Sequence, residues 1–236
     1  MTVTRSHVGN LQARVEFDSF AASYEKLHAH SIRLTGEEPE YFAAYKASYI
    51  ASKLASGPCR VLDYGCGIGM LSCQLKLRLP QAQVDGFDPS QESLGRVDPC
   101  LLVEGVFTAD LCRLRDDYDI IVMANVLHHV SPSERDNVIS DGASRLASTG
   151  KLIIFEHNPA NPLTRWAVAQ CAFDEGAVLL RPREASRRMR AAGLRTLTRD
   201  YTVFFPHWLR ALRPLEWLLN WCPAGAQYAL TGTDRK

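Results

Sequence analysis

The sequence predicts an α/β fold in which a mostly parallel sheet is doubly wound, with helices on both of its faces. From Val61 onward, short apolar runs alternate with longer segments of helical periodicity, which is typical of a parallel sheet. The first apolar run ends in a glycine-rich turn, Asp63-Tyr64-Gly65-Cys66-Gly67-Ile68-Gly69, and a helical pattern follows it. No internal repeat or interdomain linker interrupts the 236 residues, so we expect a single domain over 1–236.

Composition excludes several classes of protein. Hydrophobic residues make up 46% of the chain and charged residues 22%, as in ordinary globular domains. A net charge of +1 gives no strong attraction for nucleic acid or for an anionic membrane. The seven cysteines are scattered without a metal-ligand pattern, so we expect no metal and a reducing cytoplasm. Residues 1–10 are polar, unlike a signal peptide, and no apolar run is long enough to cross a bilayer.

Two helical patterns precede the first apolar run. Aromatic residues from Phe17 to Tyr24 share one face of the first pattern, because their spacing matches the helical period. A second pattern covers about 38–55 and turns Tyr45 and its aromatic neighbours toward one side. Gly57-Pro58 ends that helix and leads into the first strand.

The remaining elements alternate along the chain. Strands are expected at 60–63, 83–87, 101–106, 118–123, 151–155, 194–205 and 227–231. Helices are expected between them, at 68–79, 132–146, 163–178, 183–192 and 207–221. Ser131 and Glu134 have the spacing of a capping box at the start of the helix over 132–146.

The glycine-rich turn carries an acid that narrows the choice of ligand. Glycines at 65, 67 and 69 let the backbone turn sharply and approach a ligand closely. Asp63 stands two residues before the first of them, where a carboxylate would repel a pyrophosphate but suits an ammonium group. The spacing therefore favours a ligand that is cationic at this end, as S-adenosylmethionine is. A dinucleotide would need its third glycine at Met70, and a turn without a ligand is the remaining alternative.

The residues of this turn resemble motif I of the class I S-adenosylmethionine-dependent methyltransferases. The resemblance implies a Rossmann-like, mostly parallel sheet of seven strands in which the last strand is antiparallel. It also implies a helical lid over 1–56, a core over 57–236, S-adenosylmethionine as cofactor and S-adenosylhomocysteine as product. In such relatives a Phe-x-x-x-Ala-x-x-Tyr segment lies over the cofactor, which assigns Tyr24 to the cofactor site, with packing on the sheet as the alternative.

The cofactor site is expected to draw on the ends of four strands. Motif I contributes Asp63, Gly65, Cys66, Gly67 and Gly69. Asp88 ends the second strand, where its carboxylate can accept both ribose hydroxyls, although Asp88-Pro89 would also serve a turn. Relatives have an acid near the adenine amino group after the third strand, which assigns Asp110-Leu111, although Asp116 and Asp117 lie nearby. Asn125 follows the fourth strand and is expected to line the methionine end with its backbone.

Two loops that contain histidine follow the fourth and fifth strands, at the edge where reacting groups gather in such sheets. Histidine suits a general base, because its unperturbed pKa is about 6.5. His157 and His129 are therefore the predicted catalytic residues, with His157 as the base or as the residue that orients the acceptor. A purely structural role is the alternative for each histidine. The other acceptor contacts are expected from His128, Asn158, Tyr45 and Tyr228.

A longer segment, Glu156-His157-Asn158-Pro159-Ala160-Asn161-Pro162-Leu163-Thr164, resembles a bacterial subgroup of these methyltransferases. The segments over 173–180 and 225–228 extend the resemblance. Members of this subgroup are often associated with the assembly of cell-surface glycans, glycolipids or secondary metabolites, which implies a small-molecule acceptor with a hydroxyl group. The alternative is a protein that binds the cofactor without catalysis and acts as a partner or regulatory subunit.

The segment over 207–221 carries three of the four tryptophans. Burial against the sheet or in a homodimer is one explanation, and an apolar wall for a greasy or lipid-linked acceptor is the other. A nucleic-acid acceptor is disfavoured by the charge and by Ala124-Asn125-Val126. Amino-methyltransferases that act on DNA or glutamine carry Asn/Asp-Pro-Pro-aromatic at that position.

Overall fold

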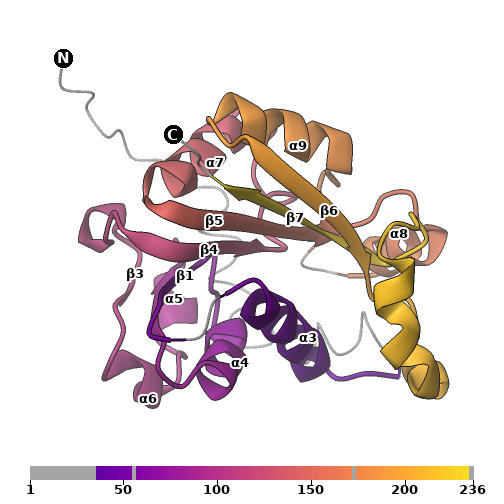
Figure 1. The fold of residues 1–236 in the computed structure, drawn as a ribbon, viewed down its shortest axis with the longest axis horizontal. Helices are drawn as coiled ribbons and strands as arrows, with labels where there is room; N and C mark the ends of the chain where they lie inside the picture. Colours follow the sequence, from indigo (N-terminus) through magenta and orange to yellow (C-terminus); the bar gives the residue numbers. More distant parts are fainter. Residues whose placement is uncertain (1–35, 55–56, 172–173, 234–236) are drawn as a thin grey trace.

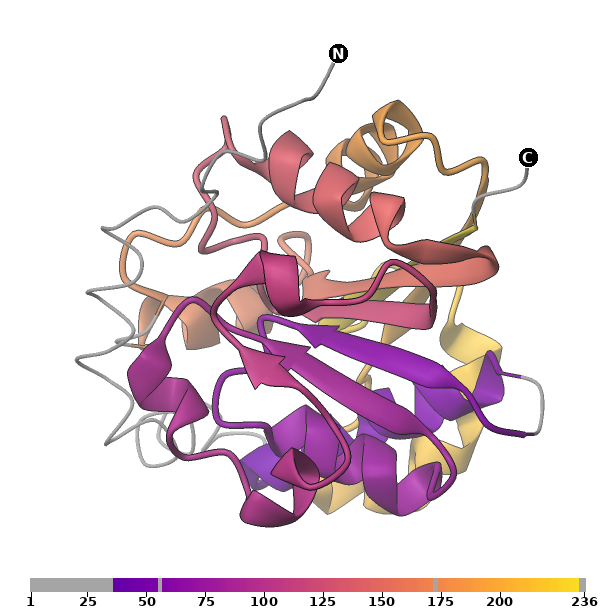
Figure 2. The ribbon, with the colours of Figure 1, turned by 90° about the vertical axis from the view of Figure 1, so that its left-hand side faces the viewer.

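A computed structural model describes residues 36–54, 57–171 and 174–233, and it confirms the predicted α/β fold. A seven-stranded sheet lies between two layers of helices, with α3 and α4 on one face and α7 and α9 on the other (Figures 1 and 2). The strands are β1 (Arg60–Tyr64), β2 (Gln83–Phe87), β3 (Phe107–Thr108), β4 (Tyr118–Ala124), β5 (Leu146–His157), β6 (Thr196–Thr202) and β7 (Gln227–Thr233). The α-helices are α3 (Pro39–Ser52), α4 (Met70–Arg78), α5 (Gln91–Leu94), α6 (Pro99–Leu102), α7 (Arg135–Ser144), α8 (Pro162–Ala169) and α9 (Pro182–Ala191).

The order of strands in the sheet is β3-β2-β1-β4-β5-β7-β6. Neighbouring strands are parallel from β3 to β5, while β7 runs antiparallel to both β5 and β6, as predicted for the last strand. The chain leaves β1 toward β2 on one side and returns to the other side at β4. In an open α/β sheet, ligands bind in the crevice at the carboxyl ends of the strands, where the order reverses in this way.

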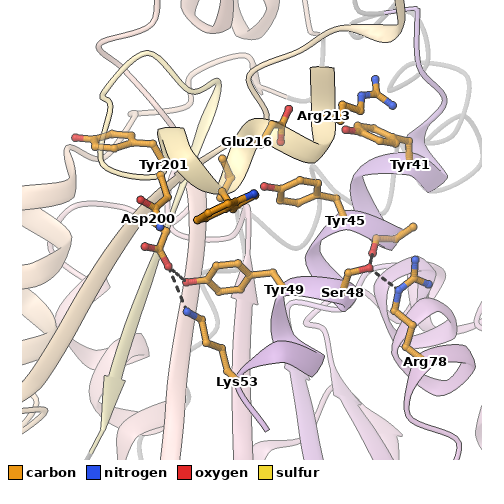
Figure 3. A pocket seen from close by; sticks show the side chains of 14 residues that line it. Tyr41, Tyr45, Ser48, Tyr49, Lys53, Arg78, Asp200, Tyr201, Arg213 and Glu216 are labelled. Carbon is orange, nitrogen blue, oxygen red and sulfur yellow. Dashed lines mark hydrogen bonds and ion pairs between the residues drawn. The ribbon is translucent and has the colours of Figure 1, made fainter. Parts of the chain in front are cut away.

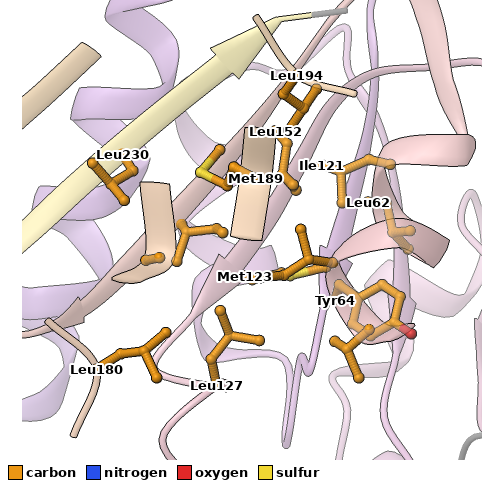
Figure 4. Close-up of a cluster of buried hydrophobic side chains, with 14 of the residues drawn as sticks. Leu62, Tyr64, Ile121, Met123, Leu127, Leu152, Leu180, Met189, Leu194 and Leu230 are labelled. Atoms are coloured by element: carbon orange, nitrogen blue, oxygen red, sulfur yellow. The ribbon is translucent and has the colours of Figure 1, made fainter. Parts of the chain in front are cut away.

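Two apolar clusters hold the helical layers on the sheet. Residues of the central strands alternate between them, as the period of two in a strand requires. Leu152 and Ile154 belong to the cluster under α7 and α9 (Figure 4), whereas Ile153 and Phe155 belong to the cluster under α3 and α4. The same alternation means that the side chain of His157 lies on the α3 face and that of Glu156 on the opposite face.

The predicted strand over 101–106 is wrong. This segment begins inside α6, and the third strand is only the two residues of β3. Asp98 caps α6 by accepting a hydrogen bond from the amide of Cys100 (2.8 Å), and Pro99 occupies the first helical turn. A cap followed by proline at the start of a helix favours helix over strand.

Two helix predictions also differ from the structure. Glu134 is the N-cap residue of α7 and makes no side-chain cap, so the predicted capping box with Ser131 is absent. The segment over 207–221 is 3₁₀-helical with a kink at Leu209, η4 (His207–Leu219), in place of an α-helix. Pro214 lies inside it and cannot donate the hydrogen bond that an α-helix needs at that position.

Some expectations lie outside the described residues, among them Tyr24, the first helical pattern and most of the proposed lid over 1–56. The helix predicted over 163–178 is α8, which ends at Ala169. Among the described segments, no helix has the length and apolar character needed to cross a membrane.

Candidate cofactor and acceptor site

The carboxyl ends of β1, β2, β4 and β5 lie side by side and bring most of the predicted site residues to one edge of the sheet. Tyr64 pairs with Phe87 at the ends of β1 and β2, and Ala124 pairs with Phe155 in β4 and β5. The glycine turn, Asp88, Asn125 and the histidine loops directly follow these ends. Segments far apart in the sequence therefore share one crevice.

The glycine turn has the backbone that its sequence predicts. Gly65, Gly67 and Gly69 all have positive φ, at 85°, 53° and 83°. The amides of Gly65 and Cys66 both donate to the carbonyl of Phe87, at 2.7 and 2.9 Å. A Cβ on Gly65 would lie 2.4 Å from Val126, whereas a Cβ on Gly67 would meet nothing within 4 Å. Gly67 therefore leaves open space beside the turn, where a ligand can approach the backbone.

Asp88 ties the end of β2 to this turn. One carboxylate oxygen accepts a hydrogen bond from the amide of Gly67 (2.8 Å), and the other accepts from the amide of Ser90 (2.9 Å). Asp110 follows β3, is exposed, and caps a short 3₁₀ helix, η2 (Leu111–Arg113), by accepting from the amide of Cys112 (2.9 Å). Both predicted acids thus lie at strand ends on this edge, with carboxylates held by backbone amides.

Asp63 and Asn125 are polar residues at the centre of the crevice. Asp63 is only 1% exposed and accepts a hydrogen bond from the Ser72 hydroxyl (2.7 Å). Burial raises its pKa to about 7, although the Ser72 hydrogen bond acts against the shift. Asn125 has a positive φ of 59°, and its buried Oδ1 has no hydrogen-bond partner in the described segments. An unpaired buried acceptor is costly unless a ligand donates to it.

The histidine loops converge on two carboxylates. His128 lies between Glu156, whose Oε2 is 2.6 Å from its Nδ1, and Asp174, whose Oδ1 is 3.3 Å from its Nε2. Glu156 also accepts a hydrogen bond from the amide of Leu127 (2.7 Å). Nε2 of His129 lies 3.5 Å from the same oxygen of Asp174. Glu156, His128 and Asp174 form a row of ionisable groups, which we call the Glu-His-Asp row.

The three histidines differ in charge near neutrality. Burial alone would lower the pKa of His128, but Glu156 and Asp174 outweigh it and raise that pKa to about 9. Burial and the positive charge of His128 lower the pKa of His157 to about 4 and that of His129 to about 3. His128 is therefore an imidazolium at pH 7, while the other two rings are neutral.

His157 is the least constrained of the three. Its ring lies 5.0 Å from that of His128, and neither of its nitrogens forms a hydrogen bond with the described parts of the chain. One potential metal-ligand atom from each of His128, His157 and Asp174 lies within 4.8 Å of the other two, which is close enough to hold a metal ion. Both nitrogens of His128 already face carboxylates.

Three residues predicted to contact the acceptor are buried and bonded within the protein. Tyr228 is fully buried in the core and donates its hydroxyl to the carbonyl of Leu180 (3.0 Å). Asn158 is also fully buried, and its amide donates to the carbonyls of Pro223 (2.9 Å) and Gly225 (2.8 Å). His128 is 2% exposed, and both of its ring nitrogens face carboxylates. Their partners are groups of the protein itself, and contact with an acceptor stays a prediction for all three.

Glu156 and Asp174 were not among the site residues predicted from the sequence. Glu156 directly precedes His157 at the end of a strand, so its position was a usable signal. Asp174 lies in a different loop from the histidines, and only the fold brings it to them. Lys46 was missed as well, although it interrupts the otherwise apolar buried face of α3.

A groove of about 570 Å³ lies between α3, β6 and η4 (Figure 3). Tyr41, Tyr45 and Tyr49 line it from α3. Its other lining residues include Asp200 and Thr202 of β6 and Glu216 and Trp217 of η4. His157 pairs with Gln227 and Gln227 with Thr202, so the groove and His157 share one row on the α3 face of the sheet. Thr202 Oγ1 is buried and unpaired within the described ranges.

A family model described as "Methyltransferase domain" matches residues 30–199. The chain belongs to this family. It is an S-adenosylmethionine-dependent methyltransferase of class I, and the open space at Gly67 and the unpaired Oδ1 of Asn125 fit that cofactor. Among curated proteins, no sequence matches the chain significantly.

Solved structures share the fold of this methyltransferase. A possible histamine N-methyltransferase from Thermotoga maritima is 19% identical with a TM-score of 0.64, and the match covers 94% of this chain and 100% of that one. Magnesium protoporphyrin IX methyltransferase from Synechocystis PCC 6803, with bound S-adenosylhomocysteine, is 18% identical (TM-score 0.66; 96% and 99% covered). The cyclase SpnF is 17% identical (TM-score 0.58; 81% of each chain covered).

Replacing Asp63 by asparagine should stabilise the methyltransferase while weakening its cofactor site. The folded state holds the Asp63 proton up to about pH 7, whereas an unfolded chain releases it near pH 4. The ionised carboxyl therefore costs the folded state progressively more as the pH rises through this window. We expect the Tm of D63N to exceed that of wild type by a larger margin at pH 8 than at pH 5. Equal Tm differences at both pH values would contradict the buried-carboxyl interpretation.

Proposed function

We propose that this methyltransferase methylates a hydroxyl group of a small-molecule acceptor, with His157 as the general base. The observation that carries the proposal is the neutral, unbonded ring of His157 beside the charged Glu-His-Asp row, at the edge where the cofactor residues end. When bound, S-adenosylmethionine supplies an electrophilic methyl group, so that the acceptor oxygen forms an O–C bond while the C–S electron pair stays on sulfur.

Residues that follow four adjacent strands would hold the cofactor. The turn from Gly65 to Gly69, with Asp63 and Cys66, receives its methionine end, and the carboxylate of Asp88 beside Pro89 accepts the ribose hydroxyls. Asp110 and Leu111 approach the adenine, and Asn125 closes the site from β4. Tyr24 remains a proposal for the lid, since it lies outside the described residues.

His157 suits the removal of a proton that becomes acidic only as the O–C bond forms. A ring with a pKa of about 4 keeps its lone pair at neutral pH, although it is a weaker base than free histidine. His128 is held by Glu156 and Asp174, and its positive charge keeps His157 unprotonated. His129 shares Asp174 and is assigned to the wall of the acceptor site.

The groove beside α3 is the proposed site for the body of the acceptor. It lies on the same sheet face as His157 and is separated from it by Gln227 alone in the cross-strand row. Tyr45 and Trp217 offer aromatic surface, while the unpaired Oγ1 of Thr202 offers a polar contact. Pockets of this mixed composition bind small organic molecules.

The outer side of η4 extends this apolar surface. The large exposed side chains here are Trp208, Leu212, Leu215, Trp217 and Leu218 of η4, and Trp221 just after it. This surface favours an apolar or lipid-linked acceptor, and a homodimer would cover the same residues. All seven cysteines are free thiols, which supports work in a reducing cytoplasm.

A second candidate function is cofactor binding without methyl transfer, as a partner or regulatory subunit. The observation that favours it is the likeness to SpnF, which is named for a [4+2] cyclisation and not for methylation. The two candidates differ in a simple assay. Incubation with S-adenosylmethionine carrying a labelled methyl group and a panel of hydroxylated, apolar and glycosylated acceptors should yield a labelled product. Cofactor binding with no labelled product across the panel would favour the second candidate.

Replacing Asp88 by alanine should weaken binding of S-adenosylhomocysteine by roughly 10- to 100-fold, because hydrogen bonds to a charged carboxylate are lost. Isothermal titration calorimetry measures the dissociation constant. Asp117→Ala is the matched control, since Asp117 is an exposed acid paired with Arg60 at the opposite edge of the sheet. An unchanged dissociation constant in D88A, or an equal loss in D117A, would contradict the ribose assignment.

Replacing His157 should remove the general base. H157A and H157Q should both retain affinity for S-adenosylhomocysteine but lose about 100-fold or more in kcat on a labelled acceptor. Glutamine can hydrogen-bond to an acceptor but cannot take its proton, so retained activity in H157Q would assign an orienting role instead. In the wild type, kcat/KM should fall only below about pH 5, as His157 with its pKa of about 4 becomes protonated. A midpoint near pH 6.5 would contradict this environment.

A further inference from the structure

Lys46 is a buried lysine that the cofactor and acceptor assignments do not use. It lies on the face of α3 that packs on the sheet, with Phe42 and Ile50 one turn away on either side. The residue is only 7% exposed, and its ammonium makes no hydrogen bond or ion pair with the described residues. Lysine is rarely buried without such a partner, because removing an ammonium from water is costly.

The ammonium of Lys46 lies within electrostatic range of charged groups at the carboxyl edge of the sheet. It interacts electrostatically with Asp63 at the end of β1 and with Glu156 at the end of β5, as well as with His157. Because β4 lies between β1 and β5, these partners bracket the end of β4, where Asn125 begins the next loop. The charge of Lys46 therefore acts at the strand ends where the methionine end of the cofactor is proposed to bind.

Neighbouring carboxylates do not satisfy this ammonium. Asp63 accepts its hydrogen bond from Ser72, and Glu156 is bonded to His128 and to the amide of Leu127. Burial lowers the pKa of Lys46 to about 8, and the two carboxylates only partly offset that cost. A positively charged donor therefore remains available inside the crevice.

Asn125 supplies a hydrogen-bond acceptor to complement this cationic donor. Its buried Oδ1 is an acceptor without a donor among the described residues. A cationic donor on α3 and a neutral acceptor after β4, both near the carboxyl edge of the sheet, match the two groups of an amino acid, a carboxylate and an ammonium. A phosphate would fit poorly, because Asp63 and Glu156 would repel its larger charge.

We propose that Lys46 binds the α-carboxylate of S-adenosylmethionine and that Oδ1 of Asn125 accepts a hydrogen bond from its α-ammonium. This inference rests on the cofactor assignment of the preceding section and names residues for one end of it. It also gives α3 a double role, because the adjacent Tyr45 lines the groove proposed for the acceptor.

Calorimetry with two ligands tests the proposal. S-adenosylhomocysteine carries the amino acid end, whereas 5′-methylthioadenosine has the same adenosine and thioether without it. The variants are Lys46→Met, which keeps the length of the side chain without its charge, and Lys76→Met. Lys76 is the control because it pairs with Glu104 and the carbonyls of Pro80 and Ala82.

We expect K46M to bind S-adenosylhomocysteine roughly 10- to 100-fold more weakly than wild type and to bind 5′-methylthioadenosine equally well. K76M should leave both dissociation constants unchanged. Unaltered affinity of K46M for S-adenosylhomocysteine would overturn the inference while leaving the cofactor assignment intact. Equal weakening for both ligands would assign Lys46 a structural role and overturn it too. If the wild type bound neither ligand, the cofactor assignment itself would fall.

Discussion

The parallel register of β1, β4 and β5 is the constraint on which the site depends. Asp63 pairs with Val122, and Ala124 pairs with Phe155, so the three strands end at the same level of the sheet. Hydrogen bonds between strands hold these ends, and the distances among the groups that follow them do not depend on long loops. The crevice is consequently preorganised by the core and not by the chain that covers it.

Bringing these strand ends together buries ionisable groups at the carboxyl edge of the sheet, and their desolvation opposes folding. The Glu-His-Asp row balances part of it, because an imidazolium between two carboxylates leaves each charge with an opposite neighbour. Asp63 and Lys46 are less well compensated, and their pKa values shift toward the neutral forms. Such perturbed groups gather where a protein binds or transforms a ligand, since a fold that needed only stability would replace them with apolar residues.

Local signals predicted most of the fold. Buried apolar runs predicted the central strands, and Pro80 marked the end of α4 to within one residue, whereas α3 ends at Ser52, before the predicted end near residue 55. The errors came where a local cap or a proline competed with periodicity. Asp98-Pro99 turned a predicted strand into α6, and Pro214 turned a predicted α-helix into η4. In both places a hydrogen bond made or lost by one residue outweighed the average preference of the segment.

For the site, the sequence alone determined the glycine turn, its preceding acid and the family, because these depend on neighbours within about ten residues. Only the tertiary structure decided that Tyr228 and Asn158 are buried, that His128 is held between Glu156 and Asp174, and that Lys46 is buried within electrostatic range of Asp63 and Glu156. Periodicity reports whether a position faces the core. It does not report which distant strand supplies the partner of a polar side chain, and that partner determines whether the group is structural or free to meet a ligand.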